Sequence, residues 1–542
     1  MPQLLERAGQ TNARVTRKTA VGLMCGVVAF ALLALYVQRL LLPAVGLFHD
    51  DGVYLVTAKA LATGQGYRII SLPTPIVQTK YPILFPALLA VVWKIFPSFP
   101  DNLILLKLVP FVAALAWFAL TYRFFLGEGL AQGRAITLTM VLSVTPWVLF
   151  LSSNLLSETL FFALTMAGLL LIRRLEKSTA FASVLPLAAG ALAGAATLTR
   201  MAGVALIAAG FFALVRKSGN AAGLFVAAAL ALCLPWLAWT SVHAPAPGSD
   251  AYYTAQNYSG WNVILNYAPE QKLTIVLTNI AATIGAFGSL FEYRLALIAL
   301  LITAALAAGF VLDIRTAGFT VTHWFCLASI GLTTLWAWMP LRFLVVLTPV
   351  LLLFILRLID ACAKKTRFRW LPVCSLLLVI PMIANDGQQL FQSLRTGATP
   401  APGAANQPPA KWHEYAEITS WLRANAPPGA VIMGTVDPLF YLYTGHPSIR
   451  SFSPDPYFLF YAPTRSEDSL GSPSGLIRSL KKQNVTVFVA TPNSEEKALK
   501  KITDGAFSLA PDAFHLALQL PDAAYRVYLV DPDRLPLIPD LP

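Results

Sequence analysis

Residues 103–126 read LILLKLVPFVAALAWFALTYRFFL, a run of 24 residues with only two charged side chains. A helix needs about 20 such residues to cross a hydrocarbon core of roughly 30 Å. Similar runs recur along the chain, and only 12% of all residues are charged, against about 25% in soluble domains. Several runs contain Gly or Pro, such as Pro110 here, which membrane helices tolerate. The sequence therefore predicts a polytopic α-helical membrane protein.

We expect about eleven transmembrane helices. They lie at residues 19–42, 103–126, 135–152, 157–173, 181–199, 201–215, 221–242, 295–312, 319–339, 342–361 and 370–385. The run at 19–42 is too long for a signal peptide, so we interpret it as a retained first helix.

Basic side chains gather at one set of helix ends, which the positive-inside rule places in the cytoplasm. They are Arg14, Arg17, Lys18, Arg134, Arg173, Arg174, Lys177, Arg216, Lys217, Arg315, Lys364, Lys365, Arg367 and Arg369. The N-terminus is then cytoplasmic, and an odd helix count puts the C-terminus on the outer, periplasmic side of the inner membrane. The net charge of +13 follows from this topology, so no nucleic-acid partner is expected.

The transmembrane domain is expected to span residues 1–386, with a first outer loop at 43–101. Within that loop, residues 50–67 have a helix-like pattern, whereas KYPILFPALLAVVWKIFP (80–97) is short for a span. We interpret the second stretch as an interfacial or re-entrant helix. A further outer loop is expected at 243–278.

A Pro/Ala/Gly-rich linker, residues 387–410, is expected to precede a small extracytoplasmic α/β domain at 411–542. Strands are predicted at 430–436, 485–490 and 525–530, and helices at 411–424 and 475–482. Alternating helices and strands are typical of such a domain. We predict that it packs over the outer mouth of the bundle, beside the aromatic residues 252–261, and that it selects the acceptor or closes the site. Its polar residues His413, Asp437 and His446 are expected in surface or capping roles.

Charged residues at the outer helix ends are the candidate functional groups. Asp50 and Asp51 directly follow the first helix; they could begin a helix or act as catalytic or metal-binding carboxylates. Lys80, Arg200 and Arg342 are isolated cations, which could reach for lipid headgroups. Three cations on one face would equally suit a phosphate-bearing ligand. Glu158 lies at the same face, at the start of the predicted fourth helix.

In this order, these motifs resemble the C-type glycosyltransferases, and most of all the branch of protein O-mannosyltransferases and lipid A aminoarabinose transferases. The likeness runs through about residues 20–360. Its motifs are DDGVYLVTAKALATGQGY (50–67), KYPILFPALL (80–89), SETLFFAL (157–164), TLTRMAGVAL (197–206) and RFLVVLTP (342–349). The departures are Asp51 in place of the commoner Glu, Tyr81 in place of Pro, and Phe343 in place of Tyr. They leave the sub-branch, and with it the donor and acceptor, open.

The resemblance implies transfer of a hexosyl or pentosyl group from a polyprenyl-phosphate carrier, with inversion, to an envelope lipid, glycan or protein. Asp50 would be the general base, and Asp51 would support it or hold the acceptor. Lys80, Arg200 and Arg342 would bind the donor phosphate. The remaining members of the site, in supporting roles, would be Glu158, Tyr54 and Tyr81. The expected partners are the lipid-linked donor, membrane lipids and the acceptor.

Two other functions stay open. A lipid or sugar-lipid transporter would need polar residues through the bilayer midplane, where this chain is mostly Ala, Leu, Val and Gly. If the protein were a non-catalytic scaffold, the occurrence of the acidic pair and three cations on one face would be a coincidence. No Gly-rich nucleotide motif follows a strand, so no nucleotide-sugar donor is expected. No resident cofactor is assigned, although a single divalent metal ion on Asp50, Asp51 or Glu158 stays open. A separation of more than about 15 Å between Asp50 and Arg342, beyond the range of charge interactions, would contradict a shared site.

Overall fold

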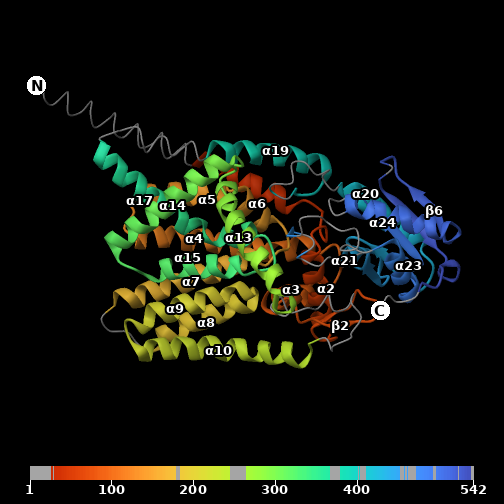
Figure 1. The fold of residues 1–542 in the computed structure, drawn as a ribbon, viewed down its shortest axis with the longest axis horizontal. Coiled ribbons are helices and arrows are strands. Elements are labelled where there is room, and N and C mark those ends of the chain that lie inside the picture. The colour runs from red at the N-terminus through yellow and green to blue at the C-terminus, as the bar shows by residue number, and fades with distance from the viewer. Residues whose placement is uncertain are drawn as a thin grey trace, which may run out of the picture.

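The computed structural model describes residues 26–538 except 28–29, 179–182, 245–263, 367–378, 401, 403–410, 452–456, 458–459, 462–471, 492–495 and 523. It consists of a bundle of helices with a smaller mixed region, which contains the C-terminal sheet, at one end (Figure 1). The bundle helices are α4 (Leu103–Gly127), α5 (Gln132–Ser143), α6 (Pro146–Ser153), α7 (Glu158–Lys177), α8 (Val184–Thr199), α9 (Val204–Val215), α10 (Gly219–Val242), α13 (Pro269–Ser289), α14 (Ala296–Ala317), α15 (Val321–Thr334), α16 (Leu341–Leu344), α17 (Thr348–Thr366) and α19 (Ile380–Thr396).

Five helices of the described residues are long and apolar enough to cross a membrane, so the chain is a multi-pass membrane protein. They are Leu103–Gly127, Gly219–Val242, Pro269–Ser289, Ala296–Ala317 and Leu341–Lys365. The pair α5 and α6, bent by 66°, would make six if counted as one span. The expected count of about eleven is not confirmed. Helices α8, α9 and α15 have only 16, 12 and 14 residues, fewer than the roughly 20 that a perpendicular span needs.

Helix α13 was not anticipated, because its residues were assigned in part to the outer loop at 243–278. It carries more polar side chains than the other spans. The buried Asn279 shows why they are tolerated, since its amide donates to the carbonyls of Thr333, Thr334 and Trp336 at 3.2, 3.2 and 2.7 Å. The aromatic residues 252–261 of that loop lie outside the described residues.

The first outer loop contains the helix that the sequence predicted, α2 (Asp50–Ala62), and the short helix α3 (Leu84–Ile95). Between them, β1 (Arg68–Ile69) pairs antiparallel with β2 (Ile76–Val77). Helix α3 has 12 residues, and its assignment as an interfacial or re-entrant segment stays a prediction. Helix α2 is buried along most of its length, so the loop is a packed part of the fold.

The C-terminal region forms a five-stranded sheet in the order β4-β3-β5-β7-β6. Strands β3 (Ile432–Gly434), β5 (Val487–Ala490) and β7 (Arg526–Val530) were predicted, whereas β4 (Ser448–Arg450) and β6 (Phe514–Gln519) were not. The predicted helices are present as α20 (Trp412–Asn425) and α23 (Pro473–Lys482), together with α21 (Asp437–Thr444) and α24 (Glu496–Leu509). Strands β4, β3 and β5 run parallel, and β6 and β7 add antiparallel partners.

The C-terminal region packs directly on the first outer loop. Ala44 belongs to the same buried cluster as Ile432 and Phe440 of the C-terminal region. The N–H of Ser448 donates to the carbonyl of Ser71 at 2.7 Å. Figure 1 shows the sheet region beside α2 and α21. The segment predicted as linker, residues 387–410, begins within helix α19, so the connection starts as regular structure.

Candidate active site

The loop that ends at α2 is shaped by Asp51. Its carboxylate accepts the backbone N–H groups of Gly46, Phe48 and Gly52 at 2.6, 3.0 and 3.0 Å. The residue is 1% exposed, and burial raises the pKa of Asp51 to about 6 against the effect of those three donors. These contacts favour a structural role for Asp51, because the carboxylate is engaged with its own loop. Its assignment as a supporting catalytic acid stays a prediction.

Asp50 points instead toward the charged residues of the bundle. Its carboxylate accepts the Tyr81 hydroxyl at 2.5 Å and lies 2.9 Å from Nη1 of Arg342. Burial disfavours the charged form, but the charges of Arg342 and Lys80 outweigh it and hold the pKa of Asp50 well below its usual range. Asp50 is therefore a carboxylate at neutral pH, and the separation from Arg342 is far inside the limit set for a shared site.

Glu158, the first residue of α7, lies between two arginines. It pairs with Nε of Arg342 and with Nη1 of Arg200 at 2.8 Å. The carboxylate is almost fully buried, whereas the two guanidinium groups are partly accessible. Both contacts are made to the same oxygen of Glu158, Oε1, so Glu158 holds both arginines at one place.

Lys80 and two tyrosines complete the site. The Lys80 ammonium lies 5.0 Å from the ring centre of Tyr81, and the ring centres of Tyr54 and Tyr81 are 5.0 Å apart. The Tyr54 hydroxyl is 3.0 Å from that of Ser157. Burial lowers the pKa of Lys80 to about 8, although Asp50 opposes the shift.

The structure thus brings together seven of the eight residues singled out from the sequence. We call the charged group among them, Asp50, Lys80, Glu158, Arg200 and Arg342, the domain-side cluster. Three cations face two carboxylates in it, so one positive charge is left in excess. A partly accessible site with surplus positive charge can hold an anion such as a phosphate. Phe343, one of the departures from the family pattern, packs its ring 5.5 Å from the guanidinium carbon of Arg200.

Sequence reasoning missed several residues of this site. Ser157 is hydrogen-bonded to both Arg200, at 3.1 Å, and Tyr54, and its place beside Glu158 could have indicated it. Gln78 accepts the N–H groups of Lys80 and Tyr81 at 2.7 and 3.3 Å and so fixes that turn. Asp437 was expected in a surface or capping role; it does begin α21, but the surface role is wrong, because the residue is 1% exposed and faces His49. No sequence signal joins residues so far apart in the chain.

A metal ion at this site stays a prediction. Among the residues that the structure describes, no three His, Cys, Asp or Glu side chains are grouped as a metal site would require. Asp50 and Glu158 both pair with Arg342, so its guanidinium takes the position that a cation between them would occupy.

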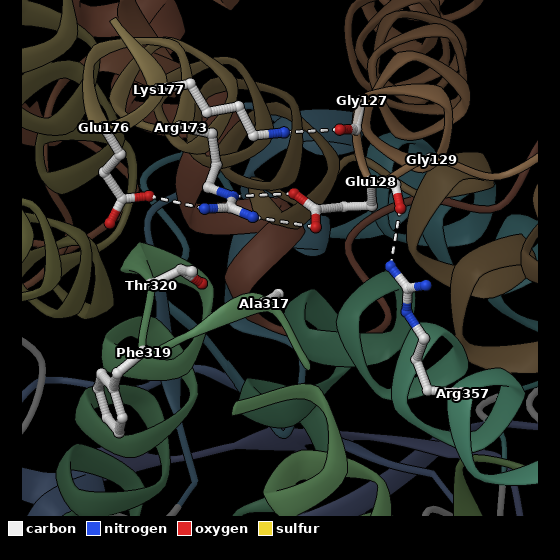
Figure 2. Close-up of a pocket in the computed structure, with 10 residues that line it drawn as sticks. All are labelled: Gly127, Glu128, Gly129, Arg173, Glu176, Lys177, Ala317, Phe319, Thr320 and Arg357. Carbon is white, nitrogen blue, oxygen red and sulfur yellow. Dashed lines mark hydrogen bonds and ion pairs between the residues drawn. The ribbon is translucent and has the colours of Figure 1, made fainter. Parts of the chain in front are cut away.

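A second group of charges lies at the opposite end of α7. Arg173 forms ion pairs with Glu128 at 2.8 Å and with Glu176 at 3.0 Å, and Lys177 donates to the carbonyl of Gly127 at 2.7 Å. Figure 2 shows these side chains around an open pocket, with Arg357 reaching the carbonyl of Glu128 at 2.7 Å. We call the group Glu128, Arg173, Glu176, Lys177, Asp313 and Arg357 the far-end cluster. In Asp313, the sixth member, Oδ1 lies 3.3 Å from Nε of Arg357 and Oδ2 lies 3.3 Å from Nε2 of His323.

Comparison with known proteins gives a fold. No protein-family profile matches the chain, and no curated protein sequence matches it either. The crystal structure of ArnT from Cupriavidus metallidurans in the apo state superposes with a TM-score of 0.56 at 13% identity, covering 96% of this chain and 100% of that one. ArnT bound to undecaprenyl phosphate gives the same TM-score at 14% identity, with 93% and 97% covered.

A third similar structure is the archaeal oligosaccharyltransferase AglB from Archaeoglobus fulgidus in complex with an inhibitory peptide and a dolichol-phosphate. It superposes with a TM-score of 0.53 at 12% identity. That match covers 94% of this chain and 75% of AglB. Both likenesses extend over nearly the whole chain and include the sheet region. The chain therefore has the fold of the C-type membrane glycosyltransferases.

Proposed function

We propose that the chain is an integral membrane glycosyltransferase that moves a sugar from a polyprenyl-phosphate carrier to an envelope acceptor on the outer face. The observation that carries the proposal is the direct contact between Asp50 and Arg342 within a cluster that has one cation in excess. A general base beside a phosphate-binding arginine is what such a transfer requires. The neighbours of the same fold were solved with undecaprenyl phosphate and with dolichol-phosphate, which supports a carrier of that kind.

In the proposed reaction, Asp50 removes a proton from a hydroxyl or amine of the acceptor. The acceptor atom then attacks the anomeric carbon of the sugar, and the bond from that carbon to the phosphate oxygen breaks. Arg342, Arg200 and Lys80 stabilise the negative charge that gathers on the departing phosphate. Because Arg200 is held by Glu158 and Lys80 lies in the turn fixed by Gln78, these two cations need little reorganisation when the charge develops.

The contact between Asp50 and Arg342 also gives a reason why the donor would bind before the acceptor is deprotonated. In the free protein, Arg342 neutralises Asp50 and keeps the pKa of that carboxylate low, which makes it a weak base. A donor phosphate would compete for the same guanidinium. Once Arg342 turns toward the phosphate, the pKa of Asp50 rises and the carboxylate becomes a better base. Donor binding would thus prepare the base for the acceptor.

The proposed topology has a cytoplasmic N-terminus and the C-terminal region outside the inner membrane. The domain-side cluster would then face the compartment in which envelope acceptors lie. Reporter fusions after Lys217 and at the C-terminus should report opposite sides, and two reporters on the same side would contradict this orientation.

Mass spectrometry of envelope glycans, glycolipids and glycoproteins tests the function whichever sugar is transferred. Cells that contain the protein should carry a glycosylated species that is absent from cells without it, and wild-type protein should restore it. Asp50→Asn, produced at the same level in the membrane, should not. Identical envelope profiles with and without the protein would contradict the proposal.

A further inference from the structure

His49, the residue before Asp50, has an unusual backbone conformation. Its φ is 61° and its ψ is −54°, and the N–H of Asp50 donates to the carbonyl of Phe48 at 2.7 Å. These are the features of a γ-turn with positive φ at its centre, a rare and strained turn. A side chain in this region of backbone space costs free energy, and such a residue persists only where its surroundings hold it. The turn sets the direction in which the Asp50 side chain leaves the backbone.

Part of the support comes from the loop itself, through Asp51. Its three backbone hydrogen bonds tie both sides of the turn together, at Gly46 and Phe48 before His49 and at Gly52 after it. This arrangement fixes the path of the loop. It leaves the His49 imidazole to be held by something else.

The C-terminal region supplies a partner for that imidazole. Nε2 of His49 lies 3.5 Å from Oδ1 of Asp437, the first residue of α21. Both side chains are buried, with 11% and 2% of their surfaces exposed. Burial lowers the pKa of His49, so at neutral pH the contact joins a neutral imidazole to the Asp437 carboxylate, and little water competes with it.

Helix α21 approaches the turn closely enough to bear on its backbone. A Cβ atom added at Gly46 would lie 2.9 Å from Cβ of Leu439, and one added at Gly52 would lie 2.7 Å from Cβ of Pro438. Only glycine permits these approaches, which flank His49 on both sides. The Lys59 ammonium lies 4.7 Å from the ring centre of Tyr441 and extends the contact along α2.

We propose that Asp437 is a positioning residue, which holds His49 in its γ-turn from the C-terminal region and thereby directs Asp50 toward Tyr81 and Arg342. The C-terminal region then contributes to the site by fixing the conformation of the turn. The effect on transfer rests on the proposed function, but the effect on the turn does not. This separation allows the two to be tested independently.

Hydrogen exchange followed by mass spectrometry tests the effect on the turn in the full-length protein. Asp437→Ala should make the amides of residues 46–53, several of which are hydrogen-bonded in the turn, exchange about tenfold faster. Asp437→Asn keeps a side-chain oxygen as an acceptor for His49 and should restore part of the protection. The matched control is Asp522→Ala, which removes the pair of Lys411 and Asp522 in the same region and should leave residues 46–53 unchanged.

Amides of β3 and β5 serve as the internal reference, since their protection shows that the sheet remains folded. Unchanged exchange at residues 46–53 in Asp437→Ala, with the sheet intact, would overturn the proposal. Equal acceleration in Asp522→Ala would also overturn it, because the turn would then respond to any change in the region.

A double-mutant cycle with His49→Gly tests the effect on transfer. Glycine adopts positive φ without strain, so the turn no longer needs Asp437. In the wild-type background, Asp437→Ala should lower kcat about tenfold with an unchanged KM for the lipid-linked donor. In the His49→Gly background the same substitution should change kcat less than about twofold. If Asp437→Ala lowers kcat by the same factor in both backgrounds, the two substitutions act independently and the positioning role is overturned. If the wild-type protein transfers no sugar, the proposed function fails while the exchange result still decides the mechanical claim.

Discussion

Helix α7 carries a charge cluster at each end, and the two are built in opposite ways. At the far end a single cation, Arg173, is held between the carboxylates of Glu128 and Glu176. At its start a single carboxylate, Glu158, is held between the guanidinium groups of Arg200 and Arg342. Arg173 lies 15 positions after Glu158, which is a rise of about 22 Å along the helix.

The difference between the clusters lies in their charge balance. In the far-end cluster three carboxylates meet three cations, so the group has no net charge. In the domain-side cluster two carboxylates meet three cations, which gives the group a net charge of +1. A balanced cluster stabilises helix packing, whereas an unbalanced one at a partly accessible site suits a ligand. This contrast separates a structural cluster from a candidate active site.

The largest effect on activity is expected for Asp50→Asn. Loss of a general base lowers turnover by about 10²- to 10⁴-fold, and Asn keeps the size of the side chain, so the protein should still fold and insert. Glu128→Gln is the matched substitution at the far end and should leave turnover per folded molecule within about twofold. The measurement is transfer from the lipid-linked donor identified in the envelope comparison. Near-normal turnover of Asp50→Asn would remove the assignment of this residue as the base.

The largest effect on stability is expected for Arg173→Gln. It leaves the buried carboxylates of Glu128 and Glu176 without their shared partner, which costs about 3–5 kcal/mol. Lys177→Gln, which removes one hydrogen bond to the Gly127 carbonyl, should cost no more than about 1 kcal/mol. Unfolding of the purified protein in detergent, followed by a fluorescence or proteolysis assay, compares the two. Equal stability of both variants would show that the far-end cluster does not support the packing.

The pH dependence of phosphate binding should distinguish Lys80 from the arginines. The pKa of Lys80 is about 8 in the free protein, and a bound phosphate raises it by favouring the charged form. The lysine contribution to affinity is thus complete below pH 8 and is lost as the pH rises toward the pKa of the complex, by up to about tenfold per pH unit. Lys80→Arg keeps its charge throughout this range and should bind undecaprenyl phosphate with a flat profile from pH 7.5 to about 9.5.

A wild-type profile as flat as that of Lys80→Arg would mean that Lys80 does not contact the phosphate. The profile of Lys177→Gln should follow the wild type, because Lys177 belongs to the far-end cluster. A changed profile in that control would attribute the pH dependence to the fold as a whole.

A smaller effect is expected where the C-terminal region touches the loop before α2. Gly46 and Gly64 have nearly the same positive φ, 79° and 75°, but only Gly46 is approached by another residue, Leu439. Alanine at either position would have a positive φ of nearly the same size, so the difference between Gly46→Ala and Gly64→Ala measures chiefly the close approach. We expect Gly46→Ala to be less stable by roughly 1–3 kcal/mol more than Gly64→Ala. Equal destabilisation would show that the loop and α21 do not press on each other.

The fold class and the residues of the site were predictable because both leave local signals. Apolar runs of the length of α4 and α10 indicate membrane helices, and isolated charges such as Glu158 and Arg342 at their ends indicate a site. The helix count was less predictable, because α8 and α9 are apolar but too short to cross alone. Helix α13 was missed because its polar Asn279 is satisfied by contacts made only in the folded bundle.

Two features of the site could not be read from the sequence at all. Asp50 and Asp51 are adjacent and of one type, yet only the γ-turn at His49 sends one toward Arg342 and the other into its own loop. The contact between His49 and Asp437 joins distant parts of the chain and depends on the packing of α21. Both features arise from tertiary packing, and neither leaves a periodicity or a motif in the sequence.

Binding of undecaprenyl phosphate to the purified protein tests the contrast between the two clusters most directly, because it requires neither the sugar nor the acceptor. Arg342→Gln and Arg357→Gln are the same substitution at opposite ends of the bundle, and both should be compared with the wild type at one ionic strength and at pH 7.5. We predict that Arg342→Gln weakens binding by about tenfold or more, whereas Arg357→Gln leaves it unchanged. Equal binding by all three proteins, or a loss confined to Arg357→Gln, would contradict the assignment of the domain-side cluster as the phosphate site.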